Sequence, residues 1–425
     1  MKMIRLLGCL IMALGLATAC SDDPSGDNGV KMSQVTLSYK LPENVKTVSF
    51  SDVKVSFKNV TTGKTSTVDA TTNDNKIQTT LPEGLYNIDL EGSVVYTIDT
   101  LTTRATNVEV KSQFRASLAD VQITGETVEV PTLQAYLHSV KDGFVIAEIA
   151  IGGSLLPSGD TYNGDSYFRI YNNTTDTLYA DGLVLFESEF GTDDKQDYKP
   201  NVMAQAFTAG TAYMVPGNGK DYPVAPGKSI LICDQAIDHT KVNPNSWDLS
   251  KADFEWYDKT DDPDGADVDN PDVPNMIPLL STMGPGLWQP NQSGTRAYVI
   301  GFLGDGINRM TAEQYLTQYK YHWTYQMAFG EDVFDMDGDA YMVPNTWVAD
   351  AVNMYPQAGT PGWLVTDASL DKGYASIASE DMSDDHYGKC VRRKYDASAK
   401  KLTDTNNSSS DFLMLQQANP NYIFK

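Results

Sequence analysis

The sequence predicts a mainly β protein with two β-sandwich domains, the second of which carries a long, loop-rich insertion containing a helix. Short runs in which apolar and polar residues alternate recur from Val35 to about Thr124, and this period of two indicates half-buried strands. A second β-rich region opens with FVIAEIAIGG at Phe144. A portion rich in Gly and Pro, residues 235–390, separates its early strands from its last ones. At 425 residues the chain is long enough for two such cores.

The N-terminus has the layout of a secretory signal. Lys2 and Arg5 precede an apolar run, Leu6 to Leu16, which is too short to span a bilayer comfortably. Small residues then lead to Cys20, an arrangement that resembles the lipobox of bacterial lipoproteins and implies that Cys20 is lipidated. We therefore expect a lipoprotein signal peptide at residues 1–19. The alternative is an ordinary signal peptide that is cut elsewhere.

The residues after Cys20 predict a flexible tether at 20–33. The run SDDPSGDNG is acidic and has a composition that cannot pack. Its first residues, together with Cys20, resemble the surface-export signal of Bacteroidetes lipoproteins. That resemblance implies an outer-membrane protein, lipid-anchored and exposed at the cell surface, whose membrane contact is its N-terminal lipid.

The charge balance argues against nucleic acid as a partner. The chain has 32 basic and 56 acidic side chains, and loss of Lys2 and Arg5 with the signal leaves 30 basic side chains and a net charge near −26. Such a field repels nucleic acid and anionic lipid surfaces.

Two cysteines remain in the predicted mature fold, because Cys9 lies in the signal and Cys20 carries the lipid. Cys233 and Cys390 could form one disulfide outside the cytosol or stay as two buried thiols, and the sequence leaves both alternatives open.

Residues 34–125 predict the first sandwich. In VKVSFKNV, Val53, Val55 and Phe57 share one face, and LPEGLYNIDLEG repeats the alternation after a Pro-Glu-Gly turn. The run from KVSFKNV to YNIDLEG resembles the prealbumin-like or carboxypeptidase-regulatory-like β-sandwich, a module that commonly serves as a spacer. We interpret GETVEVPTLQ, which follows, as the junction to the second domain.

Residues 136–425 predict the second sandwich. The run FRIYNNTTDTLYADGLVLF, Phe168 to Phe186, is interpreted as strand, polar turn and strand, a corner of the scaffold and not a binding loop. With YPVAPGKSILIC and the C-terminal VRRKYDASAKKLTDTNNSSSDFLMLQQANP, it resembles the immunoglobulin-like lamin-tail domain. The resemblance covers about 144–233 and 391–420, and the insertion at about 235–390 departs from it. The layout as a whole resembles an uncharacterised, DUF4876-like family of Bacteroidetes surface lipoproteins.

The insertion is where we expect the function to lie, since so long a structureless stretch is abnormal in a compact domain. In TAEQYLTQYKYHWTYQMAF, Thr311 and Gln314 suit a helix N-cap, and Tyr315, Leu316 and Tyr319 recur at helical spacing. The sequence predicts a single helix there, with the rest of the insertion as loops packed over the sandwich.

Aromatic residues of the insertion are the ligand-binding candidates. Exposed, they could stack on a sugar or a planar cofactor; buried, they would form the seam by which a helix docks. The candidates are Trp288, Tyr319, Tyr321, His322 and Trp323, with Tyr325 in the same cluster.

Two acidic runs could bind calcium through hard oxygen ligands. DPDGADVDNPD carries Asp262, Asp264, Asp267, Asp269 and Asp272. FDMDGDAY, the better candidate, carries Asp335, Asp337 and Asp339, although it does not match the EF-hand pattern. The alternative is a solvated acidic loop. No other cofactor is expected.

The common catalytic motifs are absent from the sequence: there is no HExxH, CxxC or Gly-x-Ser-x-Gly. We therefore expect a non-enzymatic protein that captures a nutrient, such as a glycan, a metal chelate or a cofactor. A TonB-dependent transporter as its partner is implied only by what similar surface lipoproteins do. The alternative is a structural or adhesion module with no small-molecule ligand, and a hydrolase with an unrecognised site is a third reading.

Overall fold

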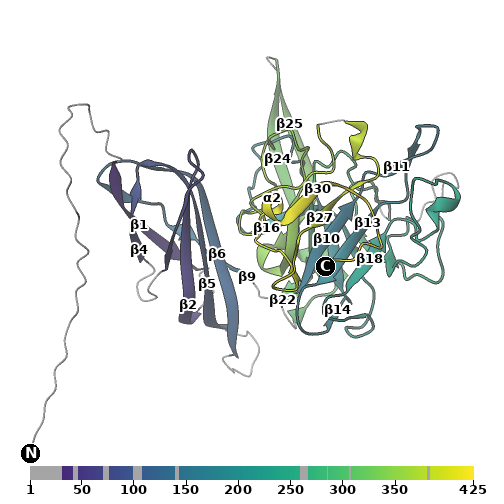
Figure 1. Cartoon of the computed structure of the whole chain (residues 1–425), viewed down its shortest axis with the longest axis horizontal. Helices are drawn as coiled ribbons and strands as arrows, with labels where there is room; N and C mark the ends of the chain where they lie inside the picture. Colours follow the sequence, from purple (N-terminus) through teal and green to yellow (C-terminus); the bar gives the residue numbers. More distant parts are fainter. Residues whose placement is uncertain are drawn as a thin grey trace, which may run out of the picture.

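The structure is a computed structural model. It describes residues 31–41, 46–69, 76–98, 108–138, 143–258, 267–284, 286–305, 308–330, 332–380 and 383–425. The predicted signal peptide, Cys20, most of the tether, Asp262 and Asp264 lie outside these ranges. Strands dominate the described chain, and they form a first and a second sandwich in sequence order (Figure 1).

The first sandwich packs two sheets around one core. The smaller sheet contains β1 (Met32–Lys40), β4 (Lys76–Pro82), β7 (Thr127–Glu129) and β8 (Leu133–Gln134). The larger has the order β3-β2-β5-β6-β9 and contains β2 (Lys46–Asn59), β3 (Thr65–Asp69), β5 (Gly84–Ile98), β6 (Val108–Ile123) and β9 (Tyr136–His138). Val53, Val55 and Phe57 are all buried in this core, so the predicted alternation is confirmed.

The predicted junction GETVEVPTLQ is part of this sandwich. Strands β7 and β8, which lie within it, pair in parallel with β1, and Val130 and Leu133 are buried. The stretch is therefore part of the smaller sheet, at the edge of β1, and is not a linker between the two sandwiches.

The first sheet of the second sandwich has six strands in the order β19-β18-β13-β10-β27-β30. They are β10 (Phe144–Ala150), β13 (Tyr167–Asn172), β18 (Ser229–Cys233), β19 (Phe254–Glu255), β27 (Lys389–Arg393) and β30 (Phe412–Gln417).

The second sheet has the order β24-β25-β16-β15-β21-β26, with β20 also paired to β16. Its strands are β15 (Leu183–Ser188), β16 (Ala206–Met214), β20 (Ile277–Leu280), β21 (Ala297–Phe302), β24 (Lys320–Phe329), β25 (Asp332–Pro344) and β26 (Val348–Asn353).

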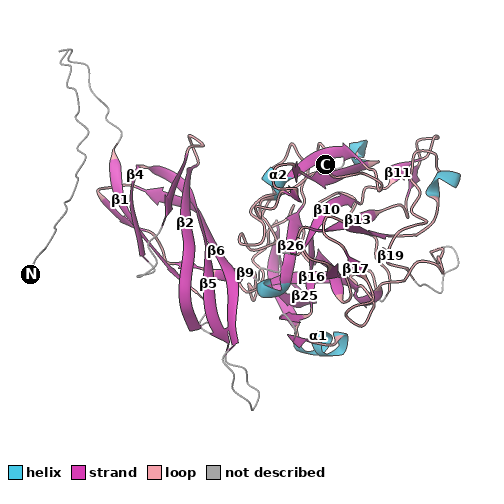
Figure 2. Cartoon of the chain, turned by 60° about the horizontal axis from the view of Figure 1, so that its bottom comes forward, coloured by secondary structure: helices cyan, strands magenta, loops and turns pink. Residues whose placement is uncertain are grey.

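Shorter elements complete the second sandwich. The two-stranded pairs are β11 (Ser154–Leu155) with β12 (Thr161–Tyr162), β14 (Leu178–Tyr179) with β17 (Pro223–Val224), β22 (Gly304–Asp305) with β23 (Asn308–Arg309), and β28 (Tyr395–Asp396) with β29 (Lys401–Leu402). The helices are α1 (Ala312–Gln318), α2 (Ser408–Asp411) and the 3-10 turns η1 (His239–Lys241), η2 (Asn345–Trp347) and η3 (Asp384–His386). All are short, and Figure 2 shows them at the periphery. Over the described residues, no helix has the length and apolar character to cross a membrane.

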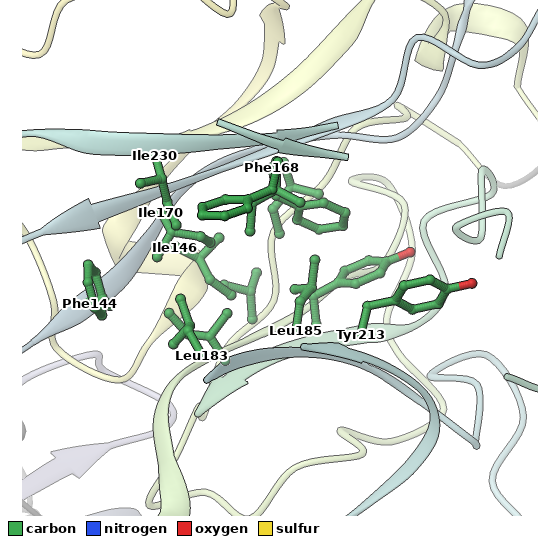
Figure 3. Close-up of a cluster of buried hydrophobic side chains, with 14 of the residues drawn as sticks. Phe144, Ile146, Phe168, Ile170, Leu183, Leu185, Tyr213 and Ile230 are labelled. Atoms are coloured by element: carbon green, nitrogen blue, oxygen red, sulfur yellow. The ribbon is translucent and has the colours of Figure 1, made fainter. Parts of the chain in front are cut away.

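The segment Phe168 to Phe186 is scaffold, as predicted. Strand β13 belongs to the six-stranded sheet and β15 to the facing one, so the turn between them is a corner of the sandwich. The buried Asn172 side chain holds this corner, because its amide donates to the carbonyls of Asp176 at 2.8 Å and Val224 at 2.7 Å. Figure 3 shows side chains of both sheets, Ile170 and Leu185 among them, meeting in the core.

The middle portion of the chain does more than cover the sandwich. It is loop-rich and contains α1, but it also supplies β19 to one sheet and β20, β21 and β24–β26 to the other. The expectation that it packs as loops over a complete sandwich is therefore wrong. Without these strands, β15 and β16 would have only each other as neighbours in that sheet.

Of the two alternatives for Cys233 and Cys390, the structure shows two buried thiols and no disulfide between them. Cys233 lies on β18 and Cys390 on β27, and β13 and β10 separate these strands in the sheet. Three strand spacings amount to roughly 14 Å, whereas a disulfide requires Cα atoms within about 7 Å. Burial also raises the pKa of both thiols, so they behave as inert core residues.

Candidate functional site

Strand β24 begins where α1 ends. Thr311 caps the helix through the predicted reciprocal bonds with Gln314, but the helix stops at Gln318 and residues from Lys320 onward are extended. The run YHWTYQ is rich in aromatic residues, which favour strands, and it pairs along its length with β25. The predicted helix is thus confirmed for its first two turns and wrong for the aromatic run.

Alternation along β24 separates two faces. Tyr321, Trp323 and Tyr325 are half-buried and point to one side, whereas His322 and Thr324 are exposed on the other. The hairpin that β24 and β25 form extends beyond the rest of the sandwich (Figure 1).

A loop that follows β15 lies along the free edge of β24. Lys199 and Thr324 exchange two backbone hydrogen bonds of 2.8 and 2.9 Å, which hold the loop in place. The ring of Tyr198 is thereby brought against the aromatic face of the strand, 5.6 Å from Trp323 and 5.1 Å from Tyr325 between ring centroids.

Five rings meet at this edge and form what we call the aromatic cluster: Phe190, Tyr198, Trp323, Tyr325 and Trp363. Tyr198 stacks on Phe190 at 3.7 Å and on Trp363 at 5.7 Å, and Phe190 lies 6.1 Å from Trp363. The indole of Trp363 is fixed by a 2.7 Å hydrogen bond to the carbonyl of Gly191. Because strand pairing and this bond position the rings, the cluster is preorganised.

A cavity of about 680 Å³ opens beside the cluster, and we call it the aromatic cavity. The aromatic side chains of Phe190, Tyr198, Tyr321 and Trp363 line it. Polar residues complete its wall, among them Lys195, Gln196, Asp197, Asn201 and Thr208. The volume lies within the usual range for small-ligand sites.

A smaller cavity of about 280 Å³ lies on the other side of Tyr198, and we call it the acidic cavity. Trp323 and Tyr325 line it together with Glu189, Asp193, Asp194 and Arg296. Burial raises the pKa of Glu189, and the Arg296 guanidinium opposes that rise. The two cavities share Phe190 and Tyr198, so the cluster forms a partition between them.

Two phenols that line the aromatic cavity, those of Tyr198 and Tyr321, remain neutral at physiological pH. Burial raises the pKa of Tyr198 and of Tyr321 to about 12 in each case. The Tyr321 hydroxyl bonds the Thr208 hydroxyl at 2.8 Å. Tyr321 and Tyr198 therefore offer neutral rings and uncharged hydroxyls to a ligand.

The structure separates the five predicted ligand-binding residues, and no two of them lie in the same place. Tyr321 lines the aromatic cavity, and Trp323 lines the acidic one. Tyr319 packs against Trp347 at 4.7 Å, beside α1. His322 faces solvent on the opposite side of β24.

Trp288 is a core residue, which corrects its assignment as a ligand contact. It is 1 % exposed and stacks on Phe168 and Tyr213 between the two sheets. A ligand at the surface cannot reach its ring.

The carboxylates proposed for calcium lie along the exposed face of β25. Asp335, Asp337 and Asp339 alternate along the strand, so neighbours are roughly 6.6 Å apart and do not wrap a single point. Two of them bond across the hairpin instead, Asp339 to His322 at 3.0 Å and Asp335 to Gln326 at 3.0 Å. Within the described residues, no group of three or more His, Cys, Asp or Glu side chains is placed to hold a metal ion.

Three residues of the site escaped the sequence analysis: Phe190, Tyr198 and Trp363. Each is an aromatic residue in a polar, Gly- or Pro-containing loop, as in FGTDDKQDYKP and TPGWLV. Such isolated rings need burial or a ligand, and this signal could have drawn attention to them.

Two of the other histidines are held by local structure. His239 is fully buried, with Nδ1 2.8 Å from the Tyr162 hydroxyl and Nε2 3.0 Å from the Gln235 carbonyl. His386 lies with Nδ1 2.6 Å from the carbonyl of Ser383. These contacts position the rings within the scaffold.

The fold and the cluster define a two-sandwich β protein with an aromatic-lined surface site. A family model described as "Protein of unknown function (DUF4876)" matches residues 225–419, which include β24, β25 and Trp363 but not Phe190 or Tyr198. None of the curated proteins compared with the chain matches it. The predicted resemblance to a DUF4876-like family is thus supported over these residues.

One solved structure supports the fold. A DUF4876 family protein from Bacteroides thetaiotaomicron VPI-5482 is similar at a TM-score of 0.53 and 20 % identity, over 91 % of this chain and 96 % of that chain. A protein from Bacteroides ovatus ATCC 8483, described as a candidate adhesin, aligns over 76 % of this chain and 88 % of that chain. Its TM-score of 0.18 and identity of 8 % are too low to carry an argument.

Proposed function

We propose that this protein is a non-enzymatic binding protein that captures a carbohydrate in the aromatic cavity. The observation that carries the proposal is the meeting of half-buried rings with amide, hydroxyl and charged groups in one cavity of about 680 Å³. Ligand sites are commonly apolar cavities with a few placed polar groups.

A sugar ring suits this wall better than a purely apolar molecule does. Its C–H faces can pack on Tyr321 and Trp363, while its hydroxyls can bond the polar residues of the rim. Lys195, Asp197 and Asn201 are exposed there and supply both donors and acceptors. The acidic residues of the neighbouring cavity disfavour a polyanion, so we propose a neutral glycan.

The location belongs to the same proposal. A lipid on Cys20 would hold the two sandwiches at the cell surface, with the first as a spacer, and would place the aromatic cavity where glycans arrive. A TonB-dependent transporter as the protein that receives the ligand rests on the resemblance to surface lipoproteins alone. Genes that adjoin such a transporter would favour this partner.

An adhesion module is the second candidate function, and one observation favours it. The tip of the β24–β25 hairpin exposes Met327, Val333 and Phe334, which are 36, 61 and 48 % exposed. Exposed apolar side chains that gather on a projecting element are typical of protein contacts.

A titration with neutral hexasaccharides tests the capture hypothesis. The purified protein is titrated with maltohexaose, cellohexaose, xylohexaose and mannohexaose, and tryptophan fluorescence and heat are followed. We expect at least one of them to bind and to change the fluorescence, because Trp363 lines the cavity and Trp323 adjoins it. Tyr321→Ala should weaken that binding by tenfold or more.

Tyr387→Ala is the matched control. Tyr387 is also half-buried, but it lies outside both cavities and bonds the Thr161 hydroxyl. This variant should bind like the unchanged protein. Equal affinity of the Tyr321 and Tyr387 variants would contradict the site, and failure of every hexasaccharide to bind would favour adhesion.

A further inference from the structure

A second cavity, of about 890 Å³, lies at the other end of the second sandwich. Strand β16 relates it to the aromatic cavity: Ala206 and Thr208 line that cavity at the start of the strand, and Met214 lines this one at its end. The two cavities share no lining residue. We call the second one the Arg309 cavity.

The wall of the Arg309 cavity is mainly apolar. Side chains from four separate segments supply it: Phe144, Leu178, Met214, Phe302 and Met310. Leu178 and Met214 are only partly buried, so they leave apolar surface facing the space. Such a wall suits the hydrocarbon part of a ligand.

One cationic side chain, that of the exposed Arg309, also lines the cavity. The guanidinium carbon of Arg309 lies 3.5 Å from the centroid of the Phe302 ring, which orients the planar group against the cavity. Gly182 lies beside it, since a Cβ at that position would be 3.4 Å from Arg309 Nη1. The face of the guanidinium is thus occupied by the ring, and its N–H donors remain at the edge.

Those donors form no ion pair with a side chain in the described parts of the chain, although Asp181 lies near enough to act on their charge. Asp181 also lines the cavity and is the acid that acts on Arg309. Its carboxylate, however, already accepts three backbone N–H bonds, from Gly219 at 2.8 Å, Asp221 at 2.9 Å and Tyr222 at 2.9 Å. No ion pair joins Arg309 to any described residue.

The N–H donors of the Arg309 guanidinium are therefore available to a ligand. Burial lowers the pKa of Arg309 and Asp181 raises it, yet a guanidinium stays charged at any physiological pH. Arg309 is exposed at the edge of the cavity, so a carboxylate that binds its guanidinium would replace water there. A carboxylate can take two parallel N–H bonds from such a group.

We propose that the Arg309 cavity binds an amphipathic carboxylate, with the hydrocarbon chain against Met214 and Phe302 and the carboxylate on the Arg309 guanidinium. This site is independent of the proposed glycan capture. A protein that fails to bind sugars could still bind such an anion.

Three ten-carbon probes separate the contributions of chain and charge: decanoate, decanol and decyltrimethylammonium. Each is titrated below its micelle concentration into the purified protein in detergent-free buffer, and binding is followed by calorimetry. We expect decanoate to bind at least tenfold more tightly than decanol and the cation to bind most weakly. Equal binding of decanoate and decanol, or no binding of decanoate, would overturn the proposal.

Two variants locate the effect. Arg309→Met keeps an unbranched side chain over Phe302 and should remove the preference for decanoate over decanol. Met214→Trp should fill the space and weaken both probes. Lys228→Met, an exposed cation elsewhere on the sandwich, is the matched control and should change nothing. An unaltered preference in a folded Arg309→Met protein would also contradict the assignment.

Discussion

At the scale of single residues, buried carboxylates join separate segments of the second sandwich. Asp371 is fully buried, and its two oxygens accept from the backbone N–H groups of Asn353 at 2.8 Å, Gly373 at 3.0 Å and Ser408 at 2.8 Å. It thereby joins β26 to the first residue of α2. Asp350 of β26 likewise bonds Arg393 of β27 and so links the two sheets.

Replacing Asp371 tests this role. In Asp371→Asn the side-chain amide would face backbone donors, so buried N–H groups would lose their acceptor. We expect the free energy of unfolding to fall by about 2–4 kcal/mol in urea denaturation. Asp272→Asn, an exposed carboxylate, should change it by less than about 0.5 kcal/mol. A loss as small as that of the control would refute the linking role.

Asp258 predicts a pH dependence of stability. Burial, together with the nearby Asp267, raises its pKa to about 7 in the folded protein, although the backbone N–H of Trp288 and the hydroxyl of Tyr213 oppose the rise. The folded state therefore holds the proton more tightly than the unfolded chain does. The resulting stabilisation is fully present below about pH 4 and is lost as the pH rises through about 7.

Urea denaturation at pH 6, 7 and 8 measures this effect. The free energy of unfolding should fall from pH 6 to pH 8, and it should fall less in Asp258→Asn, which cannot titrate. Identical pH profiles of the two proteins would show that Asp258 does not contribute.

The sequence predicted individual residues well where a short-range rule decides them. The alternation at Val53, Val55 and Phe57 and the capping box at Thr311 depend only on neighbours along the chain. Trp288 depends on which strands face each other across the core, and the sequence alone does not specify that pairing. Tyr198 enters the site for a similar reason, through the backbone pairing of Lys199 with Thr324.

At the scale of elements, the hairpin of β24 and β25 builds the site. The helical spacing of Tyr315 and Tyr319 predicted a helix that continues into the residues of β24. The alternation of Tyr321, Trp323 and Tyr325, however, has the period of a strand. Pairing with β25 decides in favour of the strand. The strand propensity of the aromatic run and its pairing with β25 therefore agree.

The packing of Trp323 on this hairpin predicts the effect of a small change. Gly338 is the cross-strand partner of Trp323, and a Cβ there would lie 2.5 Å from Cζ2 of the indole. Gly338→Ala should displace the ring, lower the free energy of unfolding by about 1–3 kcal/mol and change the near-UV circular dichroism.

Val333→Thr is the control on the same strand, because Val333 is 61 % exposed. It should leave the stability within about 0.5 kcal/mol and the spectrum unchanged. A Gly338→Ala protein with unaltered stability and spectrum would show that the ring is free to move.

At the scale of the whole molecule, strand periodicity was sufficient to predict two β-sandwiches. It did not show that the middle portion completes the second one, since β16 pairs with β20 and β25 across long sequence separations. The choice between a disulfide and two buried thiols stayed open for the same reason: nothing in the spacing of Cys233 and Cys390 shows that two strands lie between them.

The proposed anchor makes a prediction for the intact cell. Cys20→Ala removes the thiol that would carry the lipid, so the protein should leave the membrane fraction and appear in the soluble fraction on immunoblots. Cys233→Ala, which alters a buried thiol, should stay with the membranes. Continued membrane association of the Cys20 variant would contradict the lipid anchor.

The central claim is that a β-sandwich scaffold presents the aromatic cavity to a sugar. A crystal structure of the protein with whichever hexasaccharide binds most tightly in titration tests it most directly. We predict a sugar ring packed on Trp363 and Tyr321, with its hydroxyls bonded to polar residues of the rim. A hexasaccharide bound elsewhere, with the aromatic cavity filled only by solvent, would contradict the account.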